Sequence, residues 1–218
     1  MSQRDIDSDE PDGSSSSAGG TNRWIVVIAV VSAVGVFAYA FWPIKIYSLK
    51  INSMEPTIEQ GGWGVASKWS SVSPGDLVVF ELSKDYEPAK VEGIRTEGCV
   101  DGPDSGTATF LKRVVATGGQ TVSIEEGTLR IDDDAKTGAV VSTEEGDNYL
   151  EPTLKIRKET VGRASYRVRV SAAREGFGPI DVPEDHIFVL GDNRAAAVDS
   201  RCYGLIPRDA VVGRVLWR

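Results

Sequence analysis

Two side chains in this chain, Ser53 and Lys112, are of types that can together hydrolyse an acyl bond. Ser53 lies in residues 53–57, SMEPT, and Lys112 lies in residues 110–115, FLKRVV. A serine hydroxyl is a poor nucleophile until a base removes its proton. A lysine can be that base where burial disfavours its ammonium form and lowers its pKa. Taken singly, Ser53 is more simply a turn residue and Lys112 a solvated strand lysine, so the interpretation depends on their combination.

An apolar run shortly before Ser53 predicts a membrane anchor. Residues 24–42 read WIVVIAVVSAVGVFAYAFW and carry no charge. This is close to the length that a helix needs to cross the roughly 30 Å hydrocarbon layer of a bilayer. The A-x-A sequence at 38–40 leaves a cleaved signal peptide as an alternative, but the run is long for one and the preceding tail is acidic. We therefore expect a retained transmembrane helix after a disordered acidic tail, residues 1–23.

Beyond the anchor, residues 44–218 are expected to form one mostly β domain that positions the two side chains. Short apolar runs or alternating patterns predict strands at 77–80, 111–116, 121–131 (a hairpin), 165–170, 187–190 and 211–217. In the strand that holds Lys112, alternation places Lys112 and Val114 on one face and Leu111, Arg113 and Val115 on the other.

Two stretches of the β domain, about 82–108 and 133–185, are expected to be β-rich insertions. Residues 82–108 and 133–164 are rich in charge, Gly and Pro, and are expected at the surface. Arg167 and Arg169 share one face of the predicted strand 165–170 and are expected to be solvated.

The composition excludes several classes of function. The net charge is −8 and no basic stripe is present, so nucleic acid is not an expected partner. The single histidine, His186, excludes a multi-histidine metal site and is expected at the start of a strand. No metal or cofactor is expected. The two cysteines, Cys99 and Cys202, are either a disulfide or buried thiols, and the sequence leaves both open.

Taken together, these segments resemble bacterial type I signal peptidases, which are membrane-anchored proteases with a Ser/Lys dyad. The segments that match the family's patterns are residues 53–57 (S-M-x-P-T), 75–80 (G-D-x-V-V-F), 112–115 (K-R-V-V), 191–194 (G-D-N-R) and 199–201 (D-S-R). The match covers most of residues 24–218 and weakens across the insertions. The resemblance implies a β fold of the signal-peptidase and repressor-protease type with a single N-terminal transmembrane helix.

The resemblance also implies roles for the matched residues. Ser53 would attack the scissile carbonyl, its main-chain N–H would help to form the oxyanion hole, and Lys112 would be the general base. The supporting residues would be Arg113, Asp199, Ser200 and Arg201, with the pair Asp199–Arg201 bracing the wall that holds Lys112. Apolar pockets for small substrate side chains would be lined by Leu49, Ile51, Met54, Phe110 and Leu111.

The sequence departs from the family pattern around the dyad. Many members carry a hydroxyl two residues before the nucleophile as a second oxyanion donor, and Ile51 stands there. Losing one such donor can cost roughly 10²–10³ in rate. Many members also have a serine that hydrogen-bonds the base, and the aligned residue is Ala197.

The resemblance implies an endopeptidase that removes signal peptides from exported preproteins after an A-x-A type site. Its tail would be cytoplasmic, and residues 44–218 would lie outside the plasma or inner membrane. One alternative is a degenerate or dedicated-substrate member, either a slow processing enzyme or a non-catalytic binder of exported polypeptides. A self-cleaving repressor would share the dyad, but it would carry a DNA-binding domain and no anchor.

Overall fold

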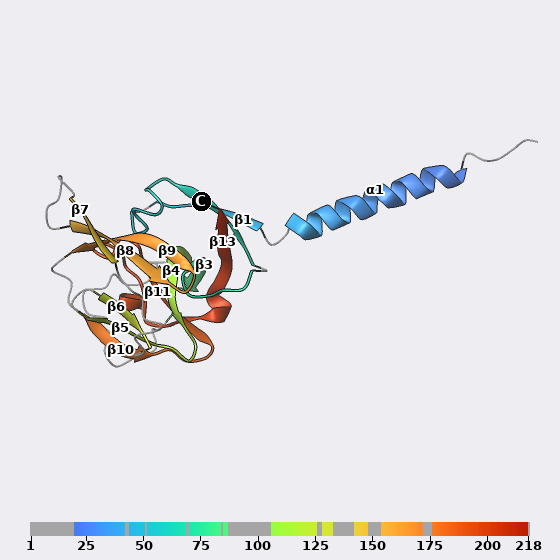
Figure 1. Cartoon of the computed structure of the whole chain (residues 1–218). Coiled ribbons are helices and arrows are strands. Elements are labelled where there is room, and N and C mark those ends of the chain that lie inside the picture. Colours follow the sequence, from blue (N-terminus) through green and yellow to red (C-terminus); the bar gives the residue numbers. More distant parts are fainter. Residues whose placement is uncertain are drawn as a thin grey trace, which may run out of the picture. The chain divides into compact units, whose positions relative to one another are not determined.

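The computed structural model describes residues 20–41, 44–50, 52–68, 70–83, 85–86, 106–125, 128–132, 142–147, 154–171 and 176–217. The chain divides into two units, Met1–Trp42 and Pro43–Arg218. In the first unit, helix α1 (Gly20–Phe41) contains most of the apolar run that the sequence predicts to be helical (Figure 1). Within the part of the chain that is described, no helix meets both the length and the apolarity needed to span a membrane.

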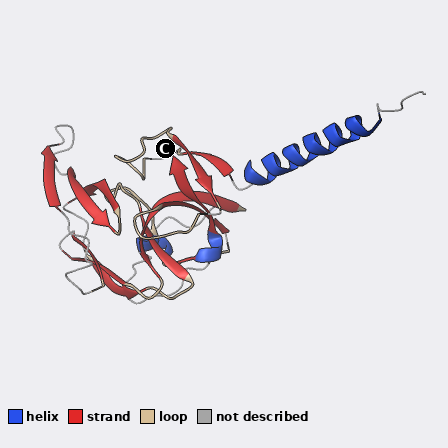
Figure 2. Ribbon diagram, turned by 45° about the vertical axis from the view of Figure 1, so that its right-hand side comes forward, coloured by secondary structure: helices blue, strands red, loops and turns tan. Residues whose placement is uncertain are grey.

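The second unit is built mainly from antiparallel strands, in agreement with the predicted fold class (Figure 2). Among the described residues, its largest sheet has seven strands. In spatial order they are β1 (Ile44–Ser48), β2 (Trp63–Ser67), β13 (Val211–Trp217), β3 (Leu77–Ser83), β4 (Thr107–Thr117), β11 (His186–Leu190) and β12 (Ile206–Pro207). A short helix, α2 (Ser200–Tyr203), and a 3₁₀ turn, η1 (Arg208–Ala210), lie on either side of β12 in the sequence.

Two smaller sheets complete the described part of this unit. One contains β10 (Phe177–Asp181), β5 (Thr121–Glu125) and β6 (Thr128–Ile131), and the other contains β7 (Ser142–Asp147), β8 (Leu154–Val161) and β9 (Ala164–Ser171). β5 and β6 are the predicted hairpin, and β9 has the predicted alternation, with Tyr166, Val168 and Val170 buried.

The surface position expected for residues 133–164 is wrong for the end of β8. Glu159 and Val161 are both buried. β8 pairs with β9 along its whole length, and Glu159 lies opposite Tyr166. Since cross-strand partners share a face, Glu159 is directed to the same side as the buried ring, and charge in the sequence was misleading as a sign of exposure.

The alternation predicted for β4 is confirmed by the packing of its apolar side chains. Val114 packs in a core cluster with Val78 and Ile187. Leu111 belongs to a different cluster, which includes Leu49 and Met54, and Val115 to a third cluster, between β11 and the smaller sheets. β4 therefore separates the apolar cores, and its charged residues Lys112 and Arg113 are carried into the interior with them.

The pairing of β4 leaves part of one edge open beside the apolar clusters. β4 pairs with β3 from Thr107 to Arg113, but its pairing with β11 begins at Arg113 and runs to Thr117. Among the described strands, none pairs with the other edge of β4 before Arg113. β1 is likewise an outer strand of the sheet. Unpaired main-chain donors and acceptors at such edges can bind an extended peptide.

Candidate active site

Ser53 lies in a turn between β1 and β2 that is fixed from two sides. Within the turn, the N–H groups of Thr57 and Ile58 donate to the Met54 carbonyl at 2.9 and 3.0 Å. Met54 is fully buried and anchors the turn in the apolar core. From outside the turn, Asn193 donates its backbone N–H to the Ser53 carbonyl at 3.1 Å and its Nδ2 to the Asn52 carbonyl at 3.1 Å. The nucleophile candidate is therefore held by its own backbone.

Lys112 comes from β4 and meets Ser53 although 59 positions separate them in the sequence. Its Nζ donates to Ser53 Oγ at 3.0 Å and to the Leu111 carbonyl at 3.1 Å. Lys112 is 1% exposed and Ser53 is 2% exposed. No carboxylate in the described part of the chain forms an ion pair with Lys112.

This environment lowers the pKa of Lys112 from its usual 10.5 to about 8. Burial is the main cause, because an ammonium loses its hydration there. The Arg201 guanidinium adds to the effect, while the carboxylates of Asp199 and Asp192 oppose it. A substantial fraction of Lys112 is then neutral in mildly alkaline solution, and a neutral amine can accept a proton from the serine.

Asp199 and Arg201 form a bidentate pair next to these residues, in which Asp199 is fully buried and Arg201 is partly exposed. Arg201 Nε and Nη2 each donate to the Asp199 carboxylate at 2.8 Å, and Arg201 Nη1 donates to the Arg194 carbonyl at 3.0 Å. Asp199 Oδ2 also accepts a hydrogen bond from the Gly191 N–H at 2.9 Å. Burial would raise the pKa of Asp199, but the Arg201 charge and these hydrogen bonds outweigh it and lower that pKa. Asp199 therefore stays ionised and fixes the segment beginning at Gly191.

Arg113, the neighbour of Lys112, forms an ion pair with a carboxylate, whereas Lys112 forms none among the described residues. Its Nε and Nη2 donate to the Asp192 carboxylate at 2.8 and 2.6 Å, and its Nη1 donates to the Gly75 carbonyl at 2.7 Å. The guanidinium carbon lies 3.7 Å from the centre of the Tyr166 ring. Ser200, also predicted as a supporting residue, accepts the Val189 N–H at 2.9 Å and thereby fixes α2 to β11.

Sequence reasoning missed a second buried ion pair, between Arg194 and Glu159. Arg194 Nη1 donates to Glu159 Oε1 at 2.9 Å, and Arg194 Nε donates to the Gly191 carbonyl at 3.0 Å. Both side chains are at most 5% exposed. The carboxylate of Glu159 raises the pKa of Arg194 against the effect of burial. The burial of Glu159 follows from the register in which β8 pairs with β9. The sequence of a single strand does not contain that register, so it offered no signal for this pair.

An apolar pocket of about 580 Å³ opens beside Ser53 and Lys112, between β1 and the unpaired part of β4. Its lining contains three of the five predicted substrate-binding residues, Leu49, Phe110 and Leu111, together with Tyr47 and Val79. Met54 is buried in the core beneath and does not line the pocket. Ile51 lies outside the described residues.

The position at which the resemblance predicts a serine near the base is occupied by Ala197, which is buried. Ala197 is 1% exposed. A Cβ added to Gly191 would come within 2.3 Å of Ala197 Cβ and 2.6 Å of the Ser53 carbonyl. Gly191 is therefore the spacer between the nucleophile turn and Ala197, and any side chain there would displace one of them.

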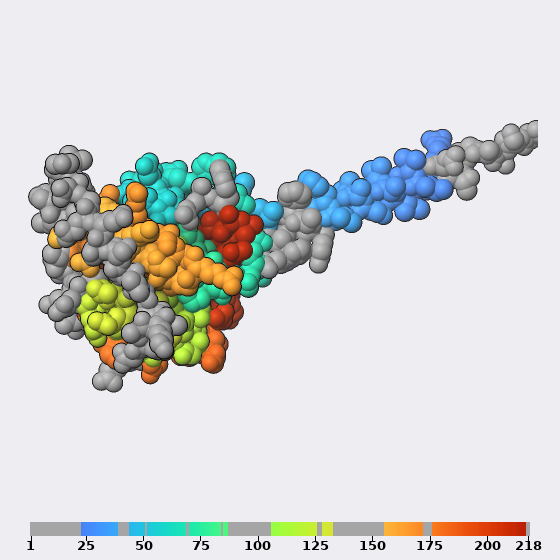
Figure 3. All heavy atoms as spheres, in the orientation of Figure 1, coloured from blue at the N-terminus to red at the C-terminus, as the bar shows by residue number. Residues whose placement is uncertain are grey.

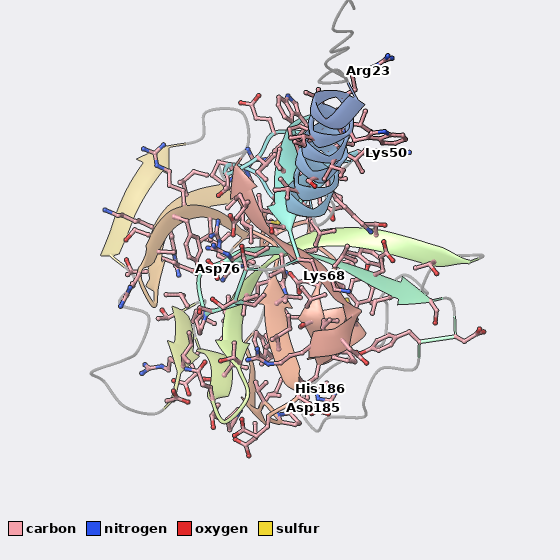
Figure 4. The ribbon with its side chains drawn as sticks, turned by 90° about the vertical axis from the view of Figure 1, so that its right-hand side faces the viewer. Arg23, Lys50, Lys68, Asp76, Asp185 and His186 are labelled. Atoms are coloured by element: carbon pink, nitrogen blue, oxygen red, sulfur yellow. The ribbon has the colours of Figure 1, made fainter. Side chains whose placement is uncertain are left out.

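The remaining candidates lie elsewhere. His186 begins β11 as predicted and contacts Asp185 through Nδ1 at 2.6 Å, on the side of the domain opposite Lys50 in Figure 4. Cys202 takes part in a disulfide, one of the two alternatives that the sequence leaves open, and the other cysteine, Cys99, lies outside the described residues. Among the described side chains, no group of three or more His, Cys, Asp or Glu residues is arranged to hold a metal ion.

The site therefore contains a buried serine that is hydrogen-bonded to a buried lysine, beside an apolar pocket and unpaired strand edges. These groups are suited to the transfer of an acyl group to the serine hydroxyl. The model of the family described as "Signal peptidase, peptidase S26" matches residues 21–218. The chain therefore belongs to the signal peptidase family, and it is a hydrolase of that class.

Relatives described as signal peptidase I or IB match about nine tenths of the chain. Signal peptidase I of Bacillus licheniformis is 30% identical over 198 residues, which cover 88% of this chain and 84% of the relative. Signal peptidase IB of Staphylococcus aureus (strain COL) is 25% identical over 200 residues, which cover 90% and 87%. A crystal structure of a signal peptidase I from Enterococcus faecalis V583 aligns with 66% of this chain and 97% of its own, at 21% identity and a TM-score of 0.35.

Proposed function

We propose that this signal peptidase cleaves preproteins with Ser53 as nucleophile and Lys112 as general base. The observation that carries the proposal is the 3.0 Å contact from Lys112 Nζ to Ser53 Oγ, in a site where neither side chain is more than 2% exposed. Burial without an ion-pair partner favours the neutral amine, which is the form that a general base needs.

The chemistry would follow in two stages. Neutral Lys112 takes the proton from Ser53 Oγ as the oxygen attacks the scissile carbonyl, and the main-chain N–H of Ser53 donates to the developing oxyanion. The lysine then gives its proton to the departing amine, which leaves an ester on Ser53. A water molecule, deprotonated by Lys112, attacks that ester; the bond to Ser53 Oγ breaks, Lys112 returns the proton to Ser53 Oγ, and the signal peptide leaves with a free carboxylate.

The pocket beside the dyad suggests how the substrate would be selected. An extended peptide can pair with the open edge of β4 before Arg113, so that alternate side chains enter the pocket. Leu49, Phe110 and Leu111 offer apolar walls to those side chains. Small residues at the first and third positions before the cleavage point fit such a site, which is the A-x-A pattern.

The same proposal includes a single-pass membrane location. Helix α1 contains most of the uncharged run of residues 24–42, and signal peptides are themselves apolar segments that partition into bilayers. We propose that the whole run of residues 24–42, which extends past the described end of α1, anchors the enzyme, with the tail in the cytoplasm and the β domain outside the plasma or inner membrane.

Cleavage of a preprotein with an A-x-A site by the detergent-solubilised full chain tests the dyad. We expect cleavage by the wild type and its loss, by at least about 10³-fold, in Ser53→Ala and in Lys112→Met. Lys158→Met is the matched control, because Lys158 is exposed on β8, and it should cleave at the wild-type rate. Cleavage that survives both dyad substitutions would place the active site elsewhere.

A second candidate function, a dedicated or non-catalytic member, is favoured by one observation. Ala197 offers no hydroxyl to orient the lysine, and the second described hydrogen bond of Lys112 goes instead to the carbonyl of its neighbour Leu111. A folded wild type that binds the preprotein but does not cleave it would support this candidate.

A further inference from the structure

Besides its hydrogen bonds to Asn193, the nucleophile turn has a charged contact, which begins at Glu55. Glu55 follows Ser53 by two residues, and its Oε2 accepts a hydrogen bond from Arg169 Nη1 at 2.8 Å. The two side chains are 20% and 24% exposed. The expectation that Arg169 is solvated is therefore wrong, whereas Arg167 on the same strand is exposed.

The backbone of Arg169 binds the segment that also holds Ser53. Its N–H donates to the Asp192 carbonyl at 2.8 Å, and its carbonyl accepts from the Ala195 N–H at 3.3 Å. Between these two, Asn193 donates to the Ser53 carbonyl at 3.1 Å. The contacts form a closed circuit from the serine through Asn193 to Arg169, and from Arg169 through Glu55 back to the turn.

This circuit joins segments that are far apart in the sequence. Glu55 and Arg169 are 114 positions apart, and β9 belongs to the stretch that the sequence presents as an insertion. In Figure 3 the β8 and β9 surface (orange) lies next to the surface of the early strands and turns (cyan to teal). The insertion thus contacts the nucleophile turn directly, through one ion pair.

The surroundings of this ion pair distinguish it from a solvated one. Arg130 and Glu125 form an ion pair of the same 2.8 Å length, but their side chains are 57% and 61% exposed. An exposed pair of that kind contributes little, because water screens both charges. Arg169, in contrast, has a buried Nε with no partner in the described part of the chain. Removing Glu55 would leave its guanidinium with still less compensation for lost hydration.

We propose that Glu55 and Arg169 form a positioning pair that holds the Ser53 turn against Asn193, and so sets the distance from Ser53 Oγ to Lys112 Nζ. The inference rests on the proposed role of Ser53 and goes beyond it. Among the described hydrogen bonds, neither side chain contacts Ser53 Oγ or Lys112 Nζ. Both act through the turn, whose small displacement would lengthen the 3.0 Å contact on which proton transfer depends.

Steady-state kinetics of preprotein cleavage give the first test. The variants are Glu55→Gln, Arg169→Met, Arg169→Lys and the double variant Glu55→Gln/Arg169→Met, with Arg167→Met as the control on the same strand. We expect Glu55→Gln and Arg169→Met each to lower kcat by about three- to tenfold with little change in KM. The double variant should be no slower than the slower single variant, Arg169→Lys should recover part of the loss, and Arg167→Met should match the wild type.

Hydrogen exchange gives a second test that does not need activity. The amides of Thr57 and Ile58 close the nucleophile turn, so a peptide covering residues 52–60 should exchange faster in Glu55→Gln and Arg169→Met. The rest of the β domain, and Arg167→Met throughout, should exchange at the wild-type rate. If the wild type proved unable to cleave, the proposed function would fail while this test of the charged contact would still stand.

Three outcomes would overturn the inference. The first is an unchanged exchange rate across residues 52–60 in both single variants. The second is a loss of activity that appears in KM rather than kcat, which would mean that Arg169 or Glu55 binds the substrate. The third is a double variant whose loss is the product of the two single losses, which would show that the residues act independently.

Discussion

Lys112 and Arg113 are consecutive buried residues of β4, at 1% and 2% exposed, and yet of the two only Arg113 forms an ion pair with a carboxylate among the described residues. Arg113 has two hydrogen bonds to the Asp192 carboxylate and a third to the Gly75 carbonyl. Lys112 donates hydrogen bonds to the Ser53 hydroxyl and to the Leu111 carbonyl, and it forms no ion pair among the described residues. Because successive side chains of a strand point to opposite faces, one step along the chain separates the two environments.

This difference in ion pairing suits Arg113 to a structural role and Lys112 to proton transfer. A buried cation is tolerated when a carboxylate and hydrogen bonds replace its hydration, as they do for Arg113. Without that compensation the group tends to lose its charge instead, and the pKa of Lys112 falls to about 8 mainly through burial. A neutral amine bonded to Ser53 Oγ is the form that a general base requires.

The largest expected effect on folding comes from breaking the Arg113–Asp192 pair. Asp192→Asn should lower the free energy of unfolding by about 3–5 kcal/mol, because it leaves a buried guanidinium without its counter-charge. Urea denaturation of the β domain in the full chain would measure the change. As a control, the double replacement Arg113→Met/Asp192→Leu should cost much less, and an equally large loss in the double variant would contradict the account.

Removing the unpaired Lys112 ammonium should instead stabilise the fold. Lys112→Met should raise the free energy of unfolding near pH 7 by up to about 3 kcal/mol, since it removes a desolvated ammonium whose pKa lies well below its unfolded value. The folded-state pKa of about 8 is below the ordinary 10.5, so the wild type carries this penalty in full below pH 8. The penalty fades as pH rises from 8 to 10.5, and so should the advantage of the variant. A destabilised variant at pH 7 would contradict this prediction.

The pH dependence of catalysis should show the same group. Below pH 8 we expect kcat/KM for preprotein cleavage to fall about tenfold for each pH unit, because the neutral fraction of Lys112 falls in that proportion. The rise of kcat/KM with pH should have an apparent pKa near 8, and kcat/KM should be constant at higher pH. A profile that is flat from pH 6 to 9 would mean that the titrating base is not Lys112.

The smallest expected effect concerns the orientation of the lysine. Ala197→Ser should raise kcat about two- to tenfold if its hydroxyl hydrogen-bonds the amine, as one added hydrogen bond can contribute about 1 kcal/mol. Ala197 is tightly surrounded, with Gly191 against it, so Ala197→Thr, with an extra methyl group, should lower stability instead. An unchanged kcat in a stable Ala197→Ser variant would show that the lysine is already well oriented.

The sequence predicted seven of the thirteen strands that the structure describes, for identifiable reasons. Apolar runs, alternation and turn residues predicted β3, β4, β5, β6, β9, β11 and β13, and the motifs around Ser53 and Lys112 lie in short local segments. The family of the chain, inferred from those motifs, is confirmed by the match over residues 21–218. The roles of Ser53 and Lys112 stay predictions, supported now by the 3.0 Å contact between them.

Long-range pairing explains what the sequence did not reveal. Glu159 reads as one more charge in a polar stretch, and its burial depends on the register of β8 against β9. Arg169 reads as solvated because the turn that contains Glu55 lies 114 positions away. Met54 was expected in the substrate pocket, but the turn directs it into the core. In each case the deciding contact joins segments whose spacing in the sequence contains no information about it.

The central claim is that Lys112 is a buried amine with a depressed pKa beside Ser53. The most direct measurement is an NMR titration of the lysine ¹³Cε signals in detergent-solubilised full chain, with Lys112 assigned by its absence in Lys112→Met. We predict one signal that titrates with a midpoint near pH 8, well apart from the exposed lysines. A Lys112 midpoint at or above pH 10 would contradict the account, because the lysine would then be a charged residue unable to activate Ser53.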